Sequence, residues 1–171
     1  MWVPAVAAAL LPLTPTPIRV VPVAPVPASV AEGGWRPLVP PGRTMVAVPP
    51  VTGAALSPVM FWSARTGLSF DAPGGYFIGP SGPDDPAARW GAPDRPTAVL
   101  LRRVAETGVT PVLSATDRRQ AIEDLRHWRA AVVVLGRLPN GDAVRRTVDD
   151  LLGAGRPVDG GWMWDVRPLV G

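Results

Sequence analysis

The sequence predicts an α/β protein: a small three-layer sandwich around a mostly parallel sheet, preceded by an extended proline-rich segment. In the second half of the chain, stretches with helical periodicity alternate with short β-branched runs, which is typical of strands connected by helices. One of these runs, AAVVVLG at 130–136, is apolar throughout, as expected for a parallel-sheet strand with both faces buried. Twelve of the 23 prolines lie within the first 50 residues, so this part is expected to be extended rather than helical.

The first 43 residues are expected to lie outside the folded domain. Residues 1–13 form an apolar segment without charge, but a bilayer-spanning helix needs about 20 such residues. No Lys or Arg precedes this run, so the positively charged start of a signal peptide is missing. A third interpretation is the end of a membrane helix. Residues 14–43 are predicted to be a fairly stiff proline-rich tether, and residues 44–171 a single α/β domain.

The domain is predicted to begin with a short strand at 44–48, TMVAV. Ser57 is a suitable helix N-cap, Pro58 suits the first helical position, and Gly67 is a suitable stop. GLSFD and GYFIG are expected to be extended because they are aromatic and β-branched between glycines. The residues 80–96, rich in Gly, Pro and Asp, are predicted to be a long turn region.

Three amphipathic helices are predicted in the second half. PTAVLLRRVAETG is expected to end at Gly108, and TDRRQAIEDLRHW to begin with a capping box of Asp117 and Gln120. Ala121, Leu125 and Trp128 form the apolar face of the second helix. Arg119, Glu123 and His127 form a polar face. NGDAVRRTVDDLLG is the third helix, with outward ion pairs Asp142–Arg146 and Arg145–Asp149 and with Asp149 and Asp150 on the surface.

Composition excludes several classes of chemistry. The chain has no Cys, which excludes disulfides, thiolate catalysis and Cys-ligated zinc. All 17 basic residues are Arg, so a P-loop lysine and Schiff-base chemistry are excluded. His127 is the sole histidine, which excludes a site of several His ligands. The net charge is +3 and the arginines alternate with carboxylates, so no nucleic-acid partner is predicted. No metal or cofactor is predicted either.

The stretch SFDAPGGYFIGPSGPDDP at 69–86 provides most of the candidate ligand-binding residues. These candidates are Asp71, Gly74, Gly75 and Tyr76, and Arg65, which lies shortly before the stretch, is a further one. A dinucleotide fingerprint must lead directly into a helix, whereas this glycine pair leads into a strand-like segment. A tight turn with positive φ at one of the glycines is therefore the favoured interpretation, and a phosphate-binding loop is the alternative.

Trp162 and Trp164 are the remaining candidate ligand-binding residues. WMWDV is predicted to be a half-buried closing strand that places Trp162, Trp164 and Val166 on one face. An indole ring combines a flat apolar face with one N–H donor, which suits stacking on a sugar ring. Core packing is the favoured interpretation of both side chains, and sugar stacking is the alternative.

A set of segments resembles the C-terminal soluble domain of polytopic actinobacterial membrane proteins of the GT-C or dolichyl-phosphate-mannose-transferase type. These segments are WRPLVPPGRT, MFWSARTGLSFDAPGGYFIGP, GAPDRPTAVLLRRVAETG, DLRHWRAAVVVLG and GGWMWDVRPLV. The resemblance implies that residues 1–13 are the exit of a membrane helix and that the domain lies on the extracytoplasmic side. It transfers no catalytic residue, because the family's catalytic acid lies in an early extracytoplasmic loop between membrane helices, to which no part of this chain corresponds.

Three functional hypotheses follow. The first is a non-catalytic accessory domain of a membrane glycosyltransferase-like protein, with a membrane partner and a possible glycan ligand. The second is an independent small α/β enzyme or binding domain for a phosphate-containing ligand or nucleotide, built on Asp71 and the glycine pair. The third is a structural interaction module that packs on a membrane partner through its aromatic residues.

Overall fold

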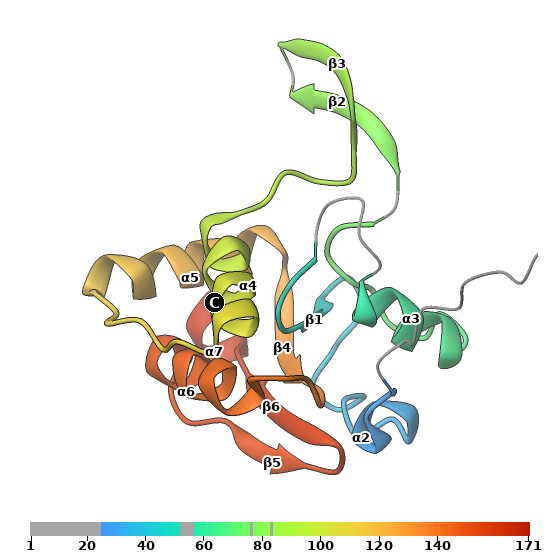
Figure 1. The fold of residues 1–171 in the computed structure, drawn as a ribbon. Coiled ribbons are helices and arrows are strands. Elements are labelled where there is room, and N and C mark those ends of the chain that lie inside the picture. The colour runs from blue at the N-terminus through green and yellow to red at the C-terminus, as the bar shows by residue number, and fades with distance from the viewer. Residues whose placement is uncertain (1–24, 52–56, 76, 83) are drawn as a thin grey trace, which may run out of the picture.

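The computed structural model describes residues 25–51, 57–75, 77–82 and 84–171, and they form a mixed α/β fold around a four-stranded sheet. The sheet has the order β1-β4-β6-β5, with the strands β1 (Thr44–Ala47), β4 (Ala130–Leu135), β6 (Gly161–Asp165) and β5 (Arg156–Val158). The described helices are α2 (Ala28–Ala31), α3 (Pro58–Arg65), α4 (Pro96–Thr107), α5 (Ala115–His127), α6 (Gly141–Leu152) and α7 (Arg167–Val170). The predicted α/β class is therefore confirmed (Figure 1).

The sheet is mixed, so the prediction of a mostly parallel sheet is wrong. β1 and β4 are parallel, whereas β6 runs antiparallel to both β4 and β5. The chain leaves β4 through α6 and enters β5 in the same direction, and a turn at Gly160 (φ 86°) returns β6 into the space between them. All of β4 is buried, as its apolar run predicts. A strand can be buried on both faces whether its neighbours run parallel or antiparallel to it. The apolar run of β4 therefore could not reveal the direction of β6.

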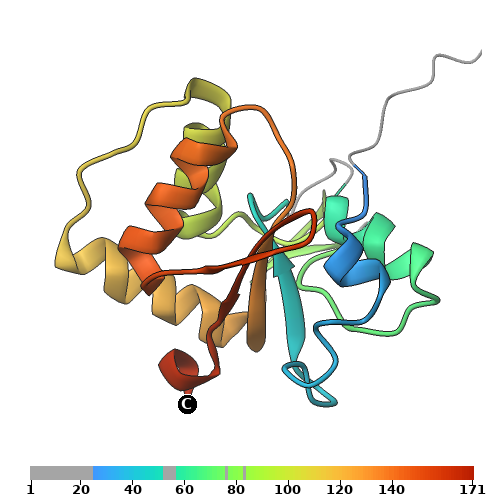
Figure 2. The same ribbon diagram turned by 90° about the horizontal axis from the view of Figure 1, so that it is seen from below.

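Hydrophobic clusters cover both faces of the sheet. One cluster joins Val46, Val133 and Trp164 of the sheet to apolar residues of α4, α5 and α6. The other joins Val132 and Val134 to the buried residues of α2 and α3. Figure 2 shows α4, α5 and α6 on one side of the sheet and α2 and α3 on the other. From Val132 to Leu135, successive side chains of β4 therefore serve different clusters, as the pleat of a strand requires.

Part of the predicted tether packs against the sheet. Val30, Trp35 and Val39 are buried, and the indole N–H of Trp35 donates a hydrogen bond to the Val30 carbonyl over 3.1 Å. The Trp35 ring also meets the Phe70 ring edge-on, with centroids 5.0 Å apart. The packed unit thus begins before β1. The predicted apolar segment 1–13 lies outside the described residues, and no described helix is long and apolar enough to cross a membrane.

The helix ends follow local sequence signals closely. Helix α3 begins after Ser57 with Pro58 in its first turn, and α4 ends at Gly108, whose φ is 70°. The predicted capping box of α5 is displaced by one turn: Ser114 is the N-cap and exchanges hydrogen bonds with Asp117. Asp117 therefore occupies the third helical position rather than the N-cap, because Ser114 offers a hydroxyl acceptor three residues earlier.

The predicted strand at GYFIG is displaced and lies outside the main sheet. β2 (Ile78–Gly82) pairs with β3 (Asp85–Trp90) in a separate antiparallel hairpin, and β3 falls in residues predicted to be a turn region. Pairing with β2 holds this Pro-rich sequence in an extended conformation that local signals did not indicate. The hairpin projects from the body of the protein (Figure 1), and Ile78 and Trp90, opposite each other at its base, are both exposed.

Candidate ligand-binding pocket

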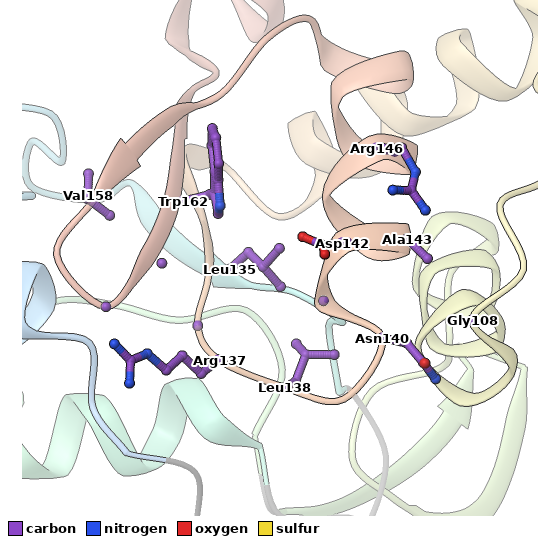
Figure 3. Close-up of a pocket in the computed structure, with 14 residues that line it drawn as sticks. Gly108, Leu135, Arg137, Leu138, Asn140, Asp142, Ala143, Arg146, Val158 and Trp162 are labelled. Carbon is purple, nitrogen blue, oxygen red and sulfur yellow. The ribbon is translucent and has the colours of Figure 1, made fainter.

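A pocket of about 720 Å³ lies where β4 ends and α6 begins. Its walls come from the β4–α6 loop, the first turns of α6, the β5–β6 turn and the end of α4 (Figure 3). The lining residues are Gly108, Leu135, Gly136, Arg137, Leu138, Asn140, Gly141, Asp142, Ala143, Arg146, Val158, Gly160, Gly161 and Trp162. A volume of this size is in the range of small-molecule sites in proteins, about 300–1,000 Å³.

Glycines allow the walls of this pocket to approach one another. A Cβ atom on Gly161 would overlap the carbonyl oxygen of Leu135, and one on Gly136 would lie 3.2 Å from the ring of Trp62. At Gly160, a Cβ atom would lie 2.9 Å from the backbone of Pro27. Gly161 therefore lets the β5–β6 turn pack on the end of β4, and Gly136 and Gly160 leave room for Trp62 and Pro27 beside the pocket.

Helix α6 enters the pocket without a side-chain cap of its own. Asn140 is its N-cap and adopts the left-handed conformation, with φ 59° and ψ 19°. Its side-chain amide donates a hydrogen bond to the Ala105 carbonyl over 2.9 Å instead. This bond ties the start of α6 to the last turn of α4, close to Asp142, which lies two residues after Asn140.

Three charged side chains of the pocket are without partners inside the described part of the chain. Arg137, Asp142 and Arg146 are exposed and make neither a hydrogen bond nor an ion pair with another described residue. The predicted ion pair between Asp142 and Arg146 is therefore wrong, although these residues have the helical spacing that favours one. In Figure 3 the Asp142 carboxylate lies in the middle of the pocket, and the two guanidinium groups lie toward different sides.

Trp162 is the predicted candidate that reaches this pocket. Its ring is partly buried and packs beside the hydrophobic cluster of α4–α6. The guanidinium carbon of Arg145 lies 4.7 Å from the ring centroid, a distance typical of a cation–π contact. Arg145 is itself held by Asp149, with 2.7 Å between nitrogen and oxygen, so the predicted Arg145–Asp149 pair is confirmed. This chain of contacts fixes the indole ring at the wall of the pocket.

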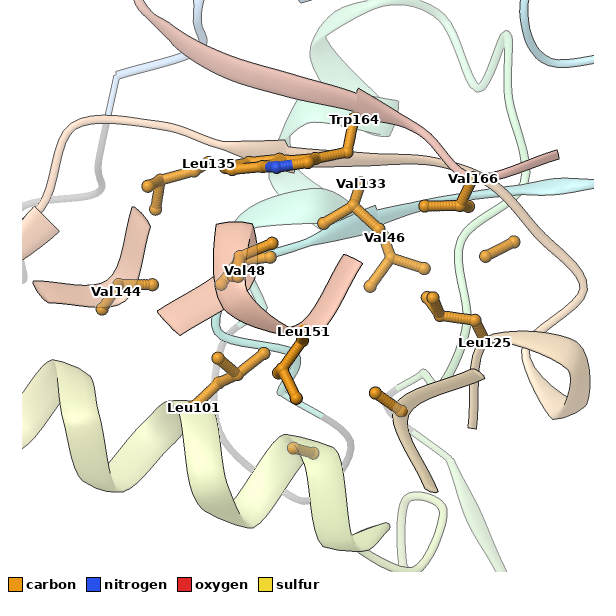
Figure 4. Packing of buried hydrophobic residues seen from close by; sticks show 14 of the residues in the cluster. Val46, Val48, Leu101, Leu125, Val133, Leu135, Val144, Leu151, Trp164 and Val166 are labelled. Carbon is orange, nitrogen blue, oxygen red and sulfur yellow. The ribbon is translucent and has the colours of Figure 1, made fainter. Parts of the chain in front are cut away.

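Trp164 lies in the core and not in the pocket. Its side chain is 3% exposed and packs among Leu135, Val133 and the helices on that face (Figure 4). Its indole N–H donates a hydrogen bond to Asp149 over 3.0 Å. Asp149 also accepts a bond from the backbone N–H of Gly155 over 2.9 Å. The prediction that Asp149 is only a surface residue is therefore wrong, because its carboxylate joins α6 to the end of the sheet.

The structure does not bring the other candidates together with Trp162. Asp71 bridges to Thr44 beside β1 and lines a separate pocket of about 280 Å³. Arg65 is exposed in the last turn of α3. Gly74 and Gly75 have φ values of 81° and 157°, as the predicted turn requires, and Tyr76 lies outside the described residues. Within the described ranges, no group of three or more His, Asp or Glu side chains could hold a metal ion.

Sequence reasoning missed the segment that forms most of the pocket. LGRLPNGD, 135–142, ends a buried strand, turns through Gly, Pro and Asn, and opens an amphipathic helix. Ligand sites in α/β proteins commonly lie at such strand-to-helix turns. The strand-to-helix turn at 135–142 is therefore the sequence signal for this pocket.

The pocket and the fold define an α/β protein with an open, charged cleft beside an aromatic wall. No family model, curated protein or solved structure matches the chain in comparisons of its sequence and structure.

Proposed function

We propose that this chain is a non-catalytic accessory domain of a membrane glycosyltransferase-like protein, situated on the extracytoplasmic side, and that its pocket binds a carbohydrate. The resemblance of its sequence segments to such domains supports the first part. The observation that carries the second part is that Trp162 and Asp142 line the same pocket from different elements. An indole face can stack on the apolar face of a sugar ring, and a carboxylate can accept hydrogen bonds from sugar hydroxyls.

The chemistry of the pocket supports binding rather than bond cleavage. Glycoside hydrolysis commonly uses two carboxyl groups on either side of the bond that is broken. Among the described lining residues, Asp142 is the one carboxylate. His127, the most suitable general base in the chain, lies exposed on α5 and does not line this pocket. The residues can therefore hold and orient a sugar, but they do not supply an acid and a base together.

Two finer features belong to the same proposal. The two helical layers and the sheet between them would form a three-layer sandwich, since hydrophobic clusters lie on opposite faces of the sheet. The proline-rich residues before it would connect this sandwich to a polytopic membrane partner. Gly136 and Gly160 of the pocket both lie against Pro27, so the pocket would be near the end of that connection.

Replacing Trp162 by alanine or Asp142 by asparagine is expected to weaken sugar binding about tenfold, a loss of about 1.4 kcal/mol. Binding of neutral hexoses to the full chain can be followed by NMR, from shifts of the indole N–H signals. Asp150→Asn is the matched control, because Asp150 is an exposed acid on the same helix outside the pocket. Equal binding by all four proteins would reject the carbohydrate site.

The projecting β2–β3 hairpin favours a second candidate, a structural module that contacts a membrane. Phe77, Ile78 and Trp90 are 49%, 61% and 50% exposed, and a two-stranded hairpin by itself is marginally stable in water. Aromatic side chains are enriched where proteins meet the lipid–water interface. By contrast, Trp164 is buried, so the Trp162/Trp164 face does not offer the exposed aromatic surface that this hypothesis first suggested.

Replacing Phe77 and Ile78 by serine is expected to reduce binding of the full chain to phosphatidylcholine–phosphatidylglycerol vesicles about tenfold, because two exposed apolar side chains would no longer insert. Co-sedimentation measures this change. Val112→Ser is the control, since Val112 is fully exposed in a different loop. A vesicle affinity that is the same for the native chain and the hairpin variant would reject this candidate.

A further inference from the structure

We infer that the carbohydrate is anionic: a sugar that carries a phosphate or a carboxylate group, held between Arg137 and Arg146. This ligand class rests on the sugar-binding function proposed above. It extends that function by assigning a role to the two arginines, which a neutral sugar would leave without a charged partner.

Some arginines elsewhere in the described fold form ion pairs, whereas others, such as Arg65 and Arg103, have none. Arg145 pairs with Asp149 at 2.7 Å, Arg102 with Asp94 at 2.8 Å, and Arg167 with Asp165 at 2.6 Å. Arg137 and Arg146 are distinguished by their position, because both line the same pocket and neither has a carboxylate partner within the described chain. Guanidinium groups bind phosphate and carboxylate in a bidentate manner, so a ligand can provide what the chain does not.

The position of Asp142 determines which part of the ligand lies where. Its carboxylate lies in the middle of the pocket, between the two arginines (Figure 3). A negative charge there repels an anionic group but accepts hydrogen bonds from hydroxyls. The sugar ring is therefore expected in the middle, against Trp162 and Asp142, and the anionic substituent toward one of the arginines. Inorganic phosphate would use only part of this arrangement.

The inference can be tested with four probes on the full chain: a neutral hexose, the same hexose as its 1-phosphate, the corresponding hexuronate, and inorganic phosphate. Isothermal titration calorimetry at low salt should give an affinity about tenfold higher for at least one anionic sugar than for the neutral hexose. About 0.2 M salt should reduce this advantage, because exposed charges are screened. A phosphate group loses its second proton near pH 6. Affinity for the sugar phosphate should therefore increase between pH 5 and 7.5 if the arginines bind its phosphate group, whereas affinity for the hexuronate should stay constant over this range.

Arg137→Gln and Arg146→Gln together should lower the affinity for the anionic sugar to that of the neutral hexose. Arg119→Gln, an exposed substitution on α5, should leave it unchanged. Equal affinities for neutral and anionic sugars in the native chain would overturn this inference and leave the proposed carbohydrate site intact. Inorganic phosphate binding as tightly as the sugar phosphate, with no effect of Asp142→Asn, would overturn the carbohydrate site. If none of the sugars binds, both are overturned.

Discussion

Replacing Asp124 by alanine is expected to lower the free energy of unfolding by about 3–5 kcal/mol. Asp124 lies on α5 with 0% of its surface exposed. Its carboxylate accepts hydrogen bonds from the Arg95 guanidinium, the backbone N–H of Thr97 at 2.9 Å and the Gln120 amide at 2.9 Å. Alanine would leave these three donors without their acceptor at the junction of α4 and α5. The Thr97 N–H is buried and the Arg95 and Gln120 side chains are partly buried, and unpaired donors in such positions are costly.

Urea unfolding of the two proteins, followed by circular dichroism, measures this loss. Glu123→Ala is the matched control, because Glu123 is the exposed neighbour on the same helix and should change stability by less than about 0.5 kcal/mol. Asp124→Asn should lie between native and alanine, since an amide retains one oxygen acceptor. A loss below about 1 kcal/mol for Asp124→Ala would show that the buried carboxylate does not hold the two helices together.

The same carboxylate predicts a dependence of stability on pH. Burial by itself would raise the pKa of Asp124, but hydrogen bonds from Thr97, Arg95 and Gln120 outweigh it and place the pKa below its ordinary value. A pKa that is lower in the folded state means that the unfolded chain binds the proton first. The stabilisation is therefore complete above about pH 4, the pKa of an unfolded Asp, and is lost as pH falls through the folded pKa. The Asp124→Ala protein should lose less stability over this acidic range.

Replacing Trp164 by alanine is expected to cost about 3–5 kcal/mol, as is usual when a large buried aromatic side chain is removed. The ring fills space between Leu135 and the helices on that face of the sheet, and its N–H is bonded to Asp149. Trp164→Phe should lower the free energy of unfolding by about 1 kcal/mol through the missing hydrogen bond. Its packing loss should be smaller than that of Trp164→Ala, because a phenyl ring remains. Asp149 keeps its bonds to Gly155 and Arg145, so it is not left without partners.

Comparison with Trp162→Ala separates stability from binding. Trp162 lies two residues away on the same face of β6, but it is only partly buried and lines the pocket. We expect thermal unfolding to detect the larger loss in Trp164→Ala, and sugar titration to detect the larger loss in Trp162→Ala. If Trp164→Phe lost sugar binding while remaining folded, Trp164 would belong to the ligand site after all.

Much of the local structure could be predicted from the residues. Proline at the first turn and glycine after the last define the ends of α3 and α4, because these residues respectively permit and stop helical backbone geometry. The continuous apolar run of β4 identified a strand with both faces buried. The alternation in β6 correctly placed Trp162 and Trp164 on one face. These are properties of single segments, and single segments are what periodicity describes.

The sequence by itself determined an α/β domain with its helices, its central strand and the absence of thiol and lysine chemistry. Only the tertiary structure decided that β6 is antiparallel, that Asp124 is buried, and that Trp162 borders the pocket while Trp164 does not. The physical reason is that each of these depends on which distant residues lie opposite. Residues that are far away along the chain set the direction of a strand, the partners of a charged group and the burial of an aromatic ring.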